Sequence, residues 1–266
     1  QKILDECEVK LAAINYASNC LGTINNVKKL TELFQQSGAI VFVDAVQYVP
    51  HGPTNVQELG CDFLVCSPYK FFGPHQGVLW GKSEILEKLE AYKVRPADNF
   101  APGKFETGTQ LHEGQAGTLG VIEYLNWIGT SMASEYHSLF SKLNDYSKNL
   151  HAAMYAIQEY EKILSEKLIS GLKDLKGVKI RGISNKKDFS RRVPTVSFTV
   201  DNKNPEEIAT KLANENIFVW HGHNYALEAI RLMGIEESGG VIRIGPVHYN
   251  TIEEIDRTLE VLKTYW

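Results

Sequence analysis

The chain has 266 residues, with 28 basic and 32 acidic side chains for a formal net charge of −4, and 43% of its residues are hydrophobic. This composition is typical of a globular protein with one large or two ordinary domains and excludes a disordered or fibrous chain. The chain has no excess of basic residues that would indicate nucleic-acid binding, and no apolar run is long enough to cross a membrane. The opening residues lack the zones of a secretory signal, and the four cysteines form no disulfide framework. We therefore expect a cytoplasmic protein.

The first half of the chain alternates short apolar runs with helical patterns. Apolar residues recur at helical spacing between residues 26 and 37, and Gly38 follows where a helix C-cap is expected. The predicted strands are 10–15, 39–43, 62–66 and 77–80, and the predicted helices are 26–37 and about 114–130. Strands that alternate with helices predict an α/β fold with a mostly parallel sheet covered by helices.

The second half has a different pattern. Residues 134–175 carry long amphipathic stretches, and Asn204-Pro205 and Thr251 are typical helix starts. Short apolar runs predict strands at 193–200, 217–220 and 241–244. We therefore predict a larger α/β domain over residues 1–130 and a smaller C-terminal α+β domain over residues 131–266.

Polar side chains follow three of the predicted strands directly. Asn19 follows the first, Asp44 and Gln47 follow the second, and Ser67 and Lys70 follow the third. Ligands of open α/β sheets bind beyond the carboxyl ends of the strands, so these residues are the first candidates for a site. Each one alone also has an ordinary explanation, because an aspartate after a strand is usually a turn residue and an exposed lysine usually snorkels.

Together these residues fit the chemistry of pyridoxal phosphate. That cofactor needs a lysine to hold its aldehyde as a Schiff base and an aspartate to keep its pyridine nitrogen protonated. Lys70 is a credible amine because the aromatic neighbours Tyr69, Phe71 and Phe72 could desolvate it, and burial lowers the pKa of a lysine. Asp44 is the candidate carboxylate.

Five segments carry a resemblance to a known family. They read SNCLGT at 18–23, VDAVQ at 43–47, SPYKFFGP at 67–74, FETGT at 105–109 and IRIGPVHYNT at 242–251. Their order and spacing resemble the class V aminotransferases, and most closely the cysteine desulfurase-like branch. The resemblance implies the type I fold of pyridoxal-phosphate-dependent transferases, with residues 1–130 as part of the cofactor-binding domain, and an amino acid as substrate.

The resemblance also implies which residues hold the cofactor. Lys70 would form the Schiff base, and Asp44 would pair with the ring nitrogen. Asn19 and Gln47 would contact the phenolic side of the ring, and Ser67 would bind the phosphate. These roles are carried over from the matching motifs.

Further roles concern the phosphate, the partner subunit and the substrate. Tyr69 would help Ser67 with the phosphate, and Thr109 would reach the phosphate of a neighbouring subunit, which implies a homodimer with shared active sites. Arg243 would bind the substrate α-carboxylate, a task that suits its planar guanidinium. His223 and Tyr225 are candidates for moving a proton at the substrate.

Two departures from the family pattern limit what the resemblance implies. Tyr225 stands where the desulfurases carry a cysteine nucleophile, and no cysteine follows Cys66. A phenol near its normal pKa does not accept sulfur as a thiolate does, so aminotransferase and epimerase reactions stay open beside desulfuration. No glycine-rich phosphate loop precedes Ser18, so we expect the chain to correspond to the C-terminal two-thirds of a family member.

Two other interpretations follow from the same residues. The missing phosphate loop favours a non-catalytic fragment or pseudoenzyme that does not hold pyridoxal phosphate. His221, His223 and His248 suggest a metal, but no cysteine or acidic pair stands beside them at ligand spacing, so we expect none.

Overall fold

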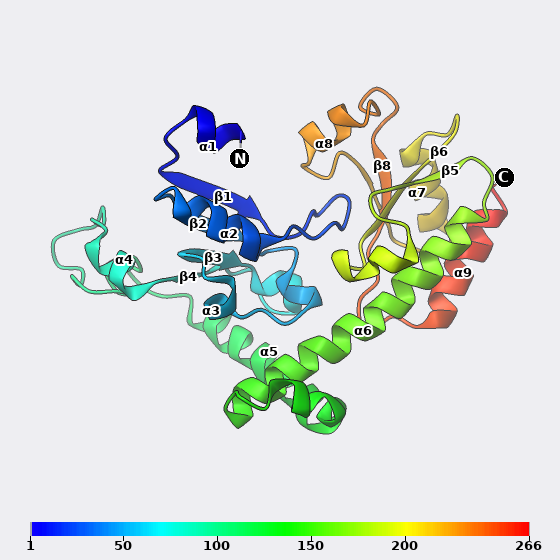
Figure 1. Ribbon diagram of the computed structural model, residues 1–266. Coiled ribbons are helices and arrows are strands. Elements are labelled where there is room, and N and C mark those ends of the chain that lie inside the picture. The colour runs from blue at the N-terminus through cyan, green and yellow to red at the C-terminus, as the bar shows by residue number, and fades with distance from the viewer. Residues whose placement is uncertain (1, 266) are drawn as a thin grey trace. The chain divides into compact units, whose positions relative to one another are not determined.

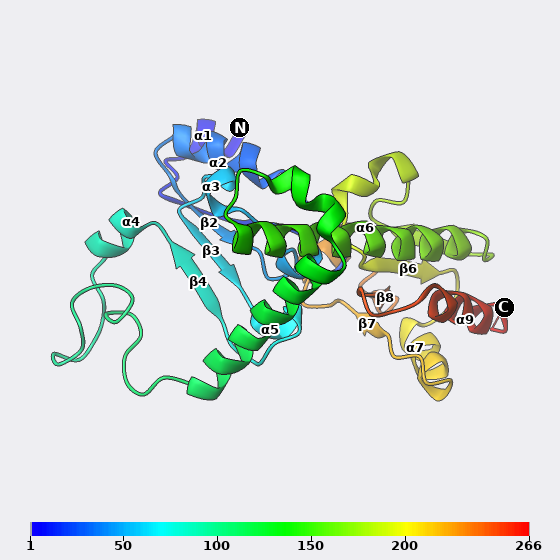
Figure 2. The ribbon, with the colours of Figure 1, turned by 90° about the horizontal axis from the view of Figure 1, so that it is seen from below.

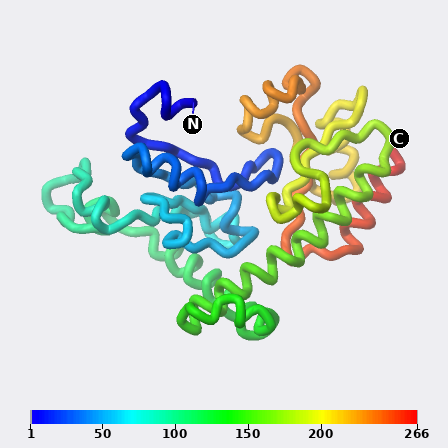
Figure 3. Tube along the Cα trace, viewed as in Figure 1, coloured from blue at the N-terminus to red at the C-terminus, as the bar shows by residue number. Residues whose placement is uncertain are grey.

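The computed structural model describes residues 2–265, and their packing divides the chain into two compact units. Unit 1 contains the residues up to Tyr16 together with Asn26–Ala153, and unit 2 contains Ala17–Asn25 and the residues from Met154 onward. The chain therefore enters unit 2 twice, first for the short excursion Ala17–Asn25 (Figure 3). The division lies inside a long helix, whereas the sequence suggested a boundary near residue 130. The boundary between a cofactor-binding domain and a smaller C-terminal domain near residue 130 stays a prediction.

Unit 1 is built on a four-stranded sheet with the order β1-β2-β3-β4 (Figure 1). The strands β1 (Leu11–Asn15), β2 (Ile40–Asp44) and β3 (Phe63–Cys66) are parallel, and β4 (Val78–Gly81) pairs antiparallel with β3. The predicted α/β class with a mostly parallel sheet is confirmed. The antiparallel edge strand follows β3 after only a short connection, which is too short for a parallel crossover.

Two helices cover one face of this sheet because the strands alternate inward and outward residues. The covered face carries Ala12, Ile14, Val41, Val43 and Leu64, and these side chains pack against α2 (Val27–Gln36) and α3 (Val56–Leu59). The residue that caps α2 is Ser37, and the predicted cap Gly38 comes one position later with φ 84°. Glycine suits that position because the left-handed conformation is strained for other residues. On the opposite face of β1, Leu11 is 59% exposed.

Near the end of unit 1, the helix α5 (His112–Ser131) and the first turns of α6 (Asp145–Lys173) cross each other closely (Figure 2). The other elements of this unit are α1 (Lys2–Glu6), α4 (Ser83–Lys88), η1 (Val49–His51), η2 (Pro68–Phe71) and η3 (Ser134–Phe140). Asn149 of α6 donates a hydrogen bond to Asn126 Oδ1 of α5 at 3.0 Å. A Cβ atom on Gly129 would lie 2.1 Å from the carbonyl oxygen of Asn149, so only glycine permits this approach.

Unit 2 is an α+β unit with an antiparallel sheet of order β5-β6-β8-β7. Its elements are β5 (Val178–Arg181), η4 (Lys186–Arg191), β6 (Val196–Val200), α7 (Pro205–Asn214), β7 (Trp220–Gly222), α8 (Leu227–Leu232), β8 (Val241–Ile244), α9 (Ile252–Lys263) and the remainder of α6. Leu164, Leu168 and Leu172 of α6 pack on Phe198 of the sheet. The helix starts predicted at Asn204 and Thr251 are confirmed, including the capping box at Thr251.

One strand of unit 2 differs from its prediction. The sequence placed a strand at 217–220, whereas β7 begins at Trp220 and pairs Trp220 with Arg243. The reason is the end of α7, where Asn216 has φ 58° and Ile217 still donates to the carbonyl of Leu212. Asn216 and Ile217 therefore complete the end of α7, and strand pairing with β8 begins only at Trp220.

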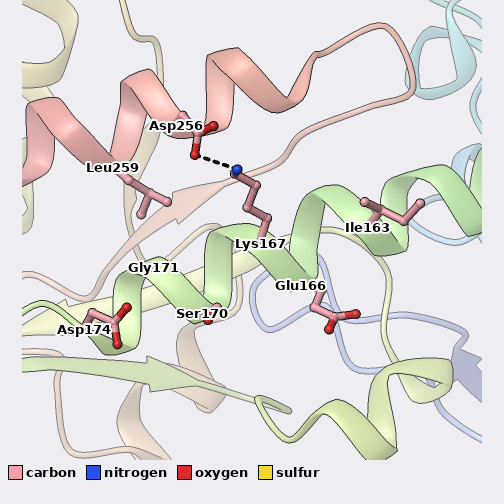
Figure 4. A pocket seen from close by; sticks show the side chains of 8 residues that line it. All are labelled: Ile163, Glu166, Lys167, Ser170, Gly171, Asp174, Asp256 and Leu259. Carbon is pink, nitrogen blue, oxygen red and sulfur yellow. Dashed lines mark ion pairs between the residues drawn. The ribbon is translucent and has the colours of Figure 1, made fainter.

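Helices α6 and α9 of unit 2 approach each other closely at Gly171. A Cβ atom on Gly171 would lie 2.3 Å from Leu259 Cδ1. The two residues line an open surface groove of about 590 Å³, in which Lys167 Nζ lies 2.8 Å from Asp256 Oδ1 (Figure 4). Leu259 is 6% exposed, so its side chain has little free space to move into.

We expect Gly171→Ala to destabilise unit 2. The added methyl group overpacks the α6–α9 contact at a cost of about 1–2 kcal/mol, partly offset by the better helix propensity of alanine. Urea unfolding followed by circular dichroism measures the change. Ser170→Ala, at the exposed neighbouring position, is the control and should leave the midpoint unchanged. An unchanged midpoint for Gly171→Ala would contradict the close contact.

Candidate functional site

The predicted amine and carboxylate of unit 1 follow neighbouring parallel strands. Asp44 is the last residue of β2, and Lys70 lies in η2, just after β3. The register pairs Asp44 with Val65, and the N–H of Ala45 donates to the carbonyl of Val65 at 2.9 Å. Because β2 and β3 are parallel neighbours, both residues belong to the carboxyl edge of one sheet.

Local structure sets the position of Lys70. Its backbone N–H donates to the carbonyl of Ser67 at 2.9 Å, which forms the turn of η2. Phe72 then has φ 75° and ends that turn. The Lys70 ammonium lies 5.6 Å from the centroid of the Tyr69 ring. The side chain of Lys70 is half-buried, as is that of Ser67, so both can be reached from solvent.

The other predicted site residues of unit 1 are Asp44, Gln47, Tyr69 and Thr109. Asp44 Oδ1 accepts a hydrogen bond from Val46 N–H at 3.0 Å, the turn-forming role that an aspartate after a strand often has. Gln47 is half-buried beyond the same strand end. Tyr69 is 47% exposed and its ring stacks on His75 with centroids 5.2 Å apart. Thr109 is exposed in the loop before α5.

In unit 2, an arginine and two asparagines from distant positions in the chain are joined by hydrogen bonds between side chains and backbone carbonyl groups. Arg243 Nη1 donates to the carbonyl oxygen of Asn19 at 2.8 Å. The side-chain amide of Asn19 donates in turn to the carbonyl oxygen of Asn224 at 2.7 Å. Asn224 belongs to the loop that joins β7 to α8, so the excursion Ala17–Asn25 links Arg243 to this loop.

The Arg243 guanidinium is half-buried and lacks an acidic partner among residues 2–265. Burial lowers its pKa, and the nearby Cys20 thiol partly opposes this. Asn19 O accepts from one of its five N–H donors, and the structure assigns no other hydrogen bond to them within the described part of the chain. A half-buried cation with free donors is suited to binding an anion such as a carboxylate.

Sequence reasoning missed two buried residues of this region, Cys20 beside the arginine and Asn224 beside Cys20. Burial raises the pKa of the Cys20 thiol, while the Arg243 charge and the Asn224 side chain partly oppose the rise. Asn224 is 4% exposed, and its Oδ1 has no hydrogen-bond partner among the described residues. The one signal in the sequence for Asn224 is that asparagine tolerates the left-handed backbone, which it adopts here with φ 51°.

The excursion that carries Asn19 is tied firmly to unit 2. Ser197 donates a hydrogen bond to the carbonyl of Cys20, and Val193 N–H donates to the carbonyl of Gly22 at 2.8 Å. Gly22 has φ 71°, and a Cβ atom there would lie 2.4 Å from the carbonyl oxygen of Thr195. Only glycine therefore permits the contact, and the backbone of Asn19 is held at a defined position.

A buried arginine supports the same region. Arg192 is 6% exposed and donates to the carbonyl oxygens of Ile183, Val193 and Thr195. Burial lowers its pKa to about 10. Its hydrogen bonds to carbonyl groups compensate part of the cost of burying the charge.

The predicted proton-handling residues lie on the surface of unit 2. Tyr225 is 93% exposed and His223 is also exposed. The N–H of Tyr225 donates to His223 Nδ1 at 3.0 Å, and the two rings meet edge to face with centroids 5.9 Å apart. Tyr225 has φ 58°, so the loop carries two successive residues in the left-handed conformation.

Neither a cluster of metal ligands nor a membrane-spanning helix occurs among the described residues. Within residues 2–265, no three histidine, cysteine or acidic side chains gather in a way that could hold a metal ion. No helix in the described part of the chain is long and apolar enough to cross a membrane.

The α/β fold is that of the pyridoxal-phosphate-dependent transferases. The sequence model of one family, described as aminotransferase class-V, matches residues 1–258. The chain therefore belongs to the class V aminotransferase family, whose members depend on pyridoxal phosphate.

Comparison with individual relatives points to the cysteine desulfurase-like branch. A probable cysteine desulfurase of Halalkalibacterium halodurans is 31% identical over 100% of this chain and 61% of the relative. The aminotransferase-like protein FGM3 of Gibberella zeae is 29% identical over 96% of this chain and 59% of the relative. The chain thus spans about three-fifths of the length of these relatives.

Solved structures agree with this placement. The apo structure of a cysteine desulfurase from Thermococcus onnurineus NA1 matches with a TM-score of 0.80 and 28% identity, covering 96% of this chain and 60% of that one. The Escherichia coli cysteine desulfurase CsdA matches in fold with a TM-score of 0.77 at 22% identity, over 99% of this chain and 61% of that one. The predicted family resemblance is confirmed.

Proposed function

We propose that the chain acts on an amino acid as a pyridoxal-phosphate-dependent enzyme of the cysteine desulfurase-like branch, with Lys70 holding the cofactor. The observation that carries the proposal is the placement of Lys70 and Asp44 after neighbouring parallel strands of one sheet. An amine and a carboxylate at one strand edge are the two groups that this cofactor requires.

The donor set of unit 1 fits pyridoxal phosphate. When bound, the cofactor supplies an aldehyde and an electron-accepting ring. Lys70 would bind the aldehyde, and Asp44 would hold a proton on the ring nitrogen. Gln47 would contact the ring, and Ser67 and Tyr69 would donate hydrogen bonds to the phosphate.

We further propose that the enzyme is a homodimer. Thr109 would bind the phosphate held by the partner subunit, so each active site would need both chains. The exposure of Thr109 in a loop of unit 1 supports this, since an exposed hydroxyl is available to a second molecule.

In unit 2, Arg243 would bind the α-carboxylate of the amino acid. The support is its half-buried guanidinium with free donors. Asn19 keeps one N–H and its Oδ1 for the ring contact proposed for it, because its side-chain hydrogen bond to the carbonyl of Asn224 uses a single N–H. His223 and Tyr225 would move a proton at the substrate, and the hydrogen bond between them would orient the imidazole.

We expect a reaction other than desulfuration through a cysteine persulfide, because the loop lacks the cysteine nucleophile. Tyr225 occupies the loop position of a cysteine nucleophile, and a neutral phenol does not accept sulfur. Cys20 is fully buried, so it does not replace that nucleophile. We therefore favour a transamination or epimerisation, because both reactions need proton transfer at Cα and neither needs a sulfur acceptor.

Reductive trapping tests the proposal. Pyridoxal phosphate added to the purified chain should give a yellow absorbance band, and borohydride should fix the cofactor covalently on the peptide that contains Lys70. Lys70→Ala should abolish both signals, while Lys88→Ala, at an exposed position of α4, serves as a control for other lysines. Assays for keto acid, α-proton exchange and sulfide then separate the three reactions. Trapping that persists in Lys70→Ala would refute the assignment.

A second candidate is a chain that does not bind the cofactor by itself. Two observations favour it: the chain spans about three-fifths of its relatives, and the edge strands of unit 1 expose Leu11 and Leu79 by 59% and 57%. Exposed leucines on edge strands are typical of a surface that another polypeptide covers. In that case the same trapping experiment gives no signal with the chain alone.

A further inference from the structure

We propose that Asn19 is a positioning residue that latches the loop of residues 222–226 to the Arg243 guanidinium. Its backbone and its side chain act on different partners. The carbonyl oxygen of Asn19 accepts from Arg243 Nη1 at 2.8 Å, and its side-chain amide donates to the carbonyl of Asn224 at 2.7 Å. One residue thus sets both the arginine and the loop that carries His223 and Tyr225.

The loop needs such support because its own conformation is unfavourable. Asn224 and Tyr225 have φ 51° and 58°, and the left-handed conformation is costly for a tyrosine. Within the turn, Tyr225 N–H donates to His223 Nδ1, Asn224 Nδ2 donates to the carbonyl of Gly222 at 3.3 Å, and Ala226 N–H donates to the carbonyl of His223. These hydrogen bonds close the turn, and Ala226 packs against the buried cluster that contains Cys20 and Val241. None of these contacts fixes the carbonyl of Asn224.

The carbonyl of Asn224 is fixed by the excursion Ala17–Asn25. Asn19 holds the carbonyl of Asn224, and the adjacent Cys20 thiol contacts the Asn224 side chain. A thiol is a weak hydrogen-bonding group, so the amide of Asn19 makes the stronger contact. The excursion is itself held in place, because Ser197 donates a hydrogen bond to the carbonyl of Cys20 and Val193 N–H donates to the carbonyl of Gly22.

The latch makes the loop respond to the state of Arg243. A carboxylate bound by the free donors of Arg243 restrains the guanidinium, and through Asn19 this restraint reaches Asn224. The latch itself rests only on the two hydrogen bonds. Its link to a substrate rests on the proposed function, which assigns the carboxylate to Arg243.

Limited proteolysis with chymotrypsin at Tyr225 tests the latch, because this side chain is 93% exposed and cleavage requires the loop to open. Asn19→Ala removes the side-chain donor but keeps the backbone carbonyl for Arg243. We expect cleavage at Tyr225 to be about three- to tenfold faster than in the parent chain, as the loss of one net hydrogen bond implies. Asn19→Asp, which loses the same N–H group, should behave alike and covers the case in which the alanine variant does not fold.

The matched control is Ser18→Ala, which removes the Ser18 hydroxyl that accepts from Leu21 N–H at 3.0 Å inside the excursion. This variant should leave cleavage at Tyr225 unchanged. Equal acceleration in Ser18→Ala and Asn19→Ala would overturn the proposal, because it would indicate general loosening of the excursion. An unchanged rate in both Asn19 variants would also overturn it.

A second arm separates the latch from the proposed function. L-Alanine should slow cleavage at Tyr225 in the parent chain but not in Arg243→Gln. Faster cleavage in Asn19→Ala without any protection by L-alanine supports the latch and counts against Arg243 as a carboxylate site. Protection by L-alanine with no effect of the Asn19 variants supports the carboxylate site and refutes the latch.

Discussion

Asp62→Asn should lower the stability of unit 1 by about 2–3 kcal/mol, the effect of breaking a buried ion pair whose partner stays in place. Asp62 is 6% exposed and lies before β3. Its Oδ1 lies 2.6 Å from Lys82 Nζ, and its Oδ2 accepts from Val41 N–H at 2.8 Å and from Gln35 Nε2 at 3.1 Å. The carboxylate therefore joins α2, β2 and the end of β4. Urea unfolding followed by circular dichroism measures the loss.

The pH dependence of this effect has a definite sign. Burial opposes ionisation of Asp62, but the hydrogen bonds from Lys82, Val41 and Gln35 outweigh it and lower the pKa of the carboxyl group. A group with a lowered pKa stabilises the fold above its unfolded value of about 3.9 and loses this contribution as the pH falls through the folded pKa. The stability difference between the parent chain and Asp62→Asn should therefore shrink below about pH 4.

The control for this variant is Asp145→Asn. Asp145 also pairs with a lysine, Lys148, at 2.7 Å, but its side chain is 94% exposed. An exposed pair gains little because solvent screens the charges. Asp145→Asn should therefore leave the midpoint unchanged, and a loss equal to that of Asp62→Asn would contradict the role of burial.

Gly129→Ala should destabilise the crossing of α5 and α6 by about 2–3 kcal/mol, after allowance for the better helix propensity of alanine. The new methyl group would lie 2.1 Å from the carbonyl oxygen of Asn149 and 2.6 Å from its carbonyl carbon. These are backbone atoms, so no change of rotamer relieves the clash and the helices must separate. Separation also weakens the hydrogen bond between Asn149 and Asn126. Thermal unfolding followed by circular dichroism measures the effect.

Gly120→Ala, in the same helix, is the control with the opposite sign. No atom lies within 4 Å of a Cβ added at Gly120, and the residue is exposed. Alanine should therefore stabilise α5 by about 0.5–1 kcal/mol through backbone entropy and propensity. A similar loss in both variants would show that substitution anywhere in α5 is harmful, and the close crossing would then not explain the result.

Strand positions and the family were predictable because they depend on local pattern. The apolar runs that form β2 and β3 end at Asp44 and just before Ser67, so the sequence pattern alone predicts that the candidate residues share one sheet edge. The motif around Arg243 identified an arginine strand in the same way. Such signals are contained within a few successive residues.

Contacts between distant segments were not predictable. Asn19 and Asn224 meet through a single hydrogen bond, and no periodicity relates an early loop to a late one. The strand expected at 217–220 moved to Trp220–Gly222 because the end of α7 uses Ile217, a competition that hydropathy does not reveal. The roles of Lys70, Asp44 and the other carried-over residues stay predictions, because they concern a bound cofactor.

The excursion Ala17–Asn25 has a consequence for how this chain is synthesised. Unit 2 combines the short segment Ala17–Asn25 with the residues from Met154 onward. A ribosome releases the early piece long before its partners β6 and β8 exist, so the pairing of Thr23 with Arg192 closes a very long loop. The residues from Met154 onward therefore do not form a complete unit 2 by themselves, and a gene fragment that starts at Met154 encodes an incomplete unit.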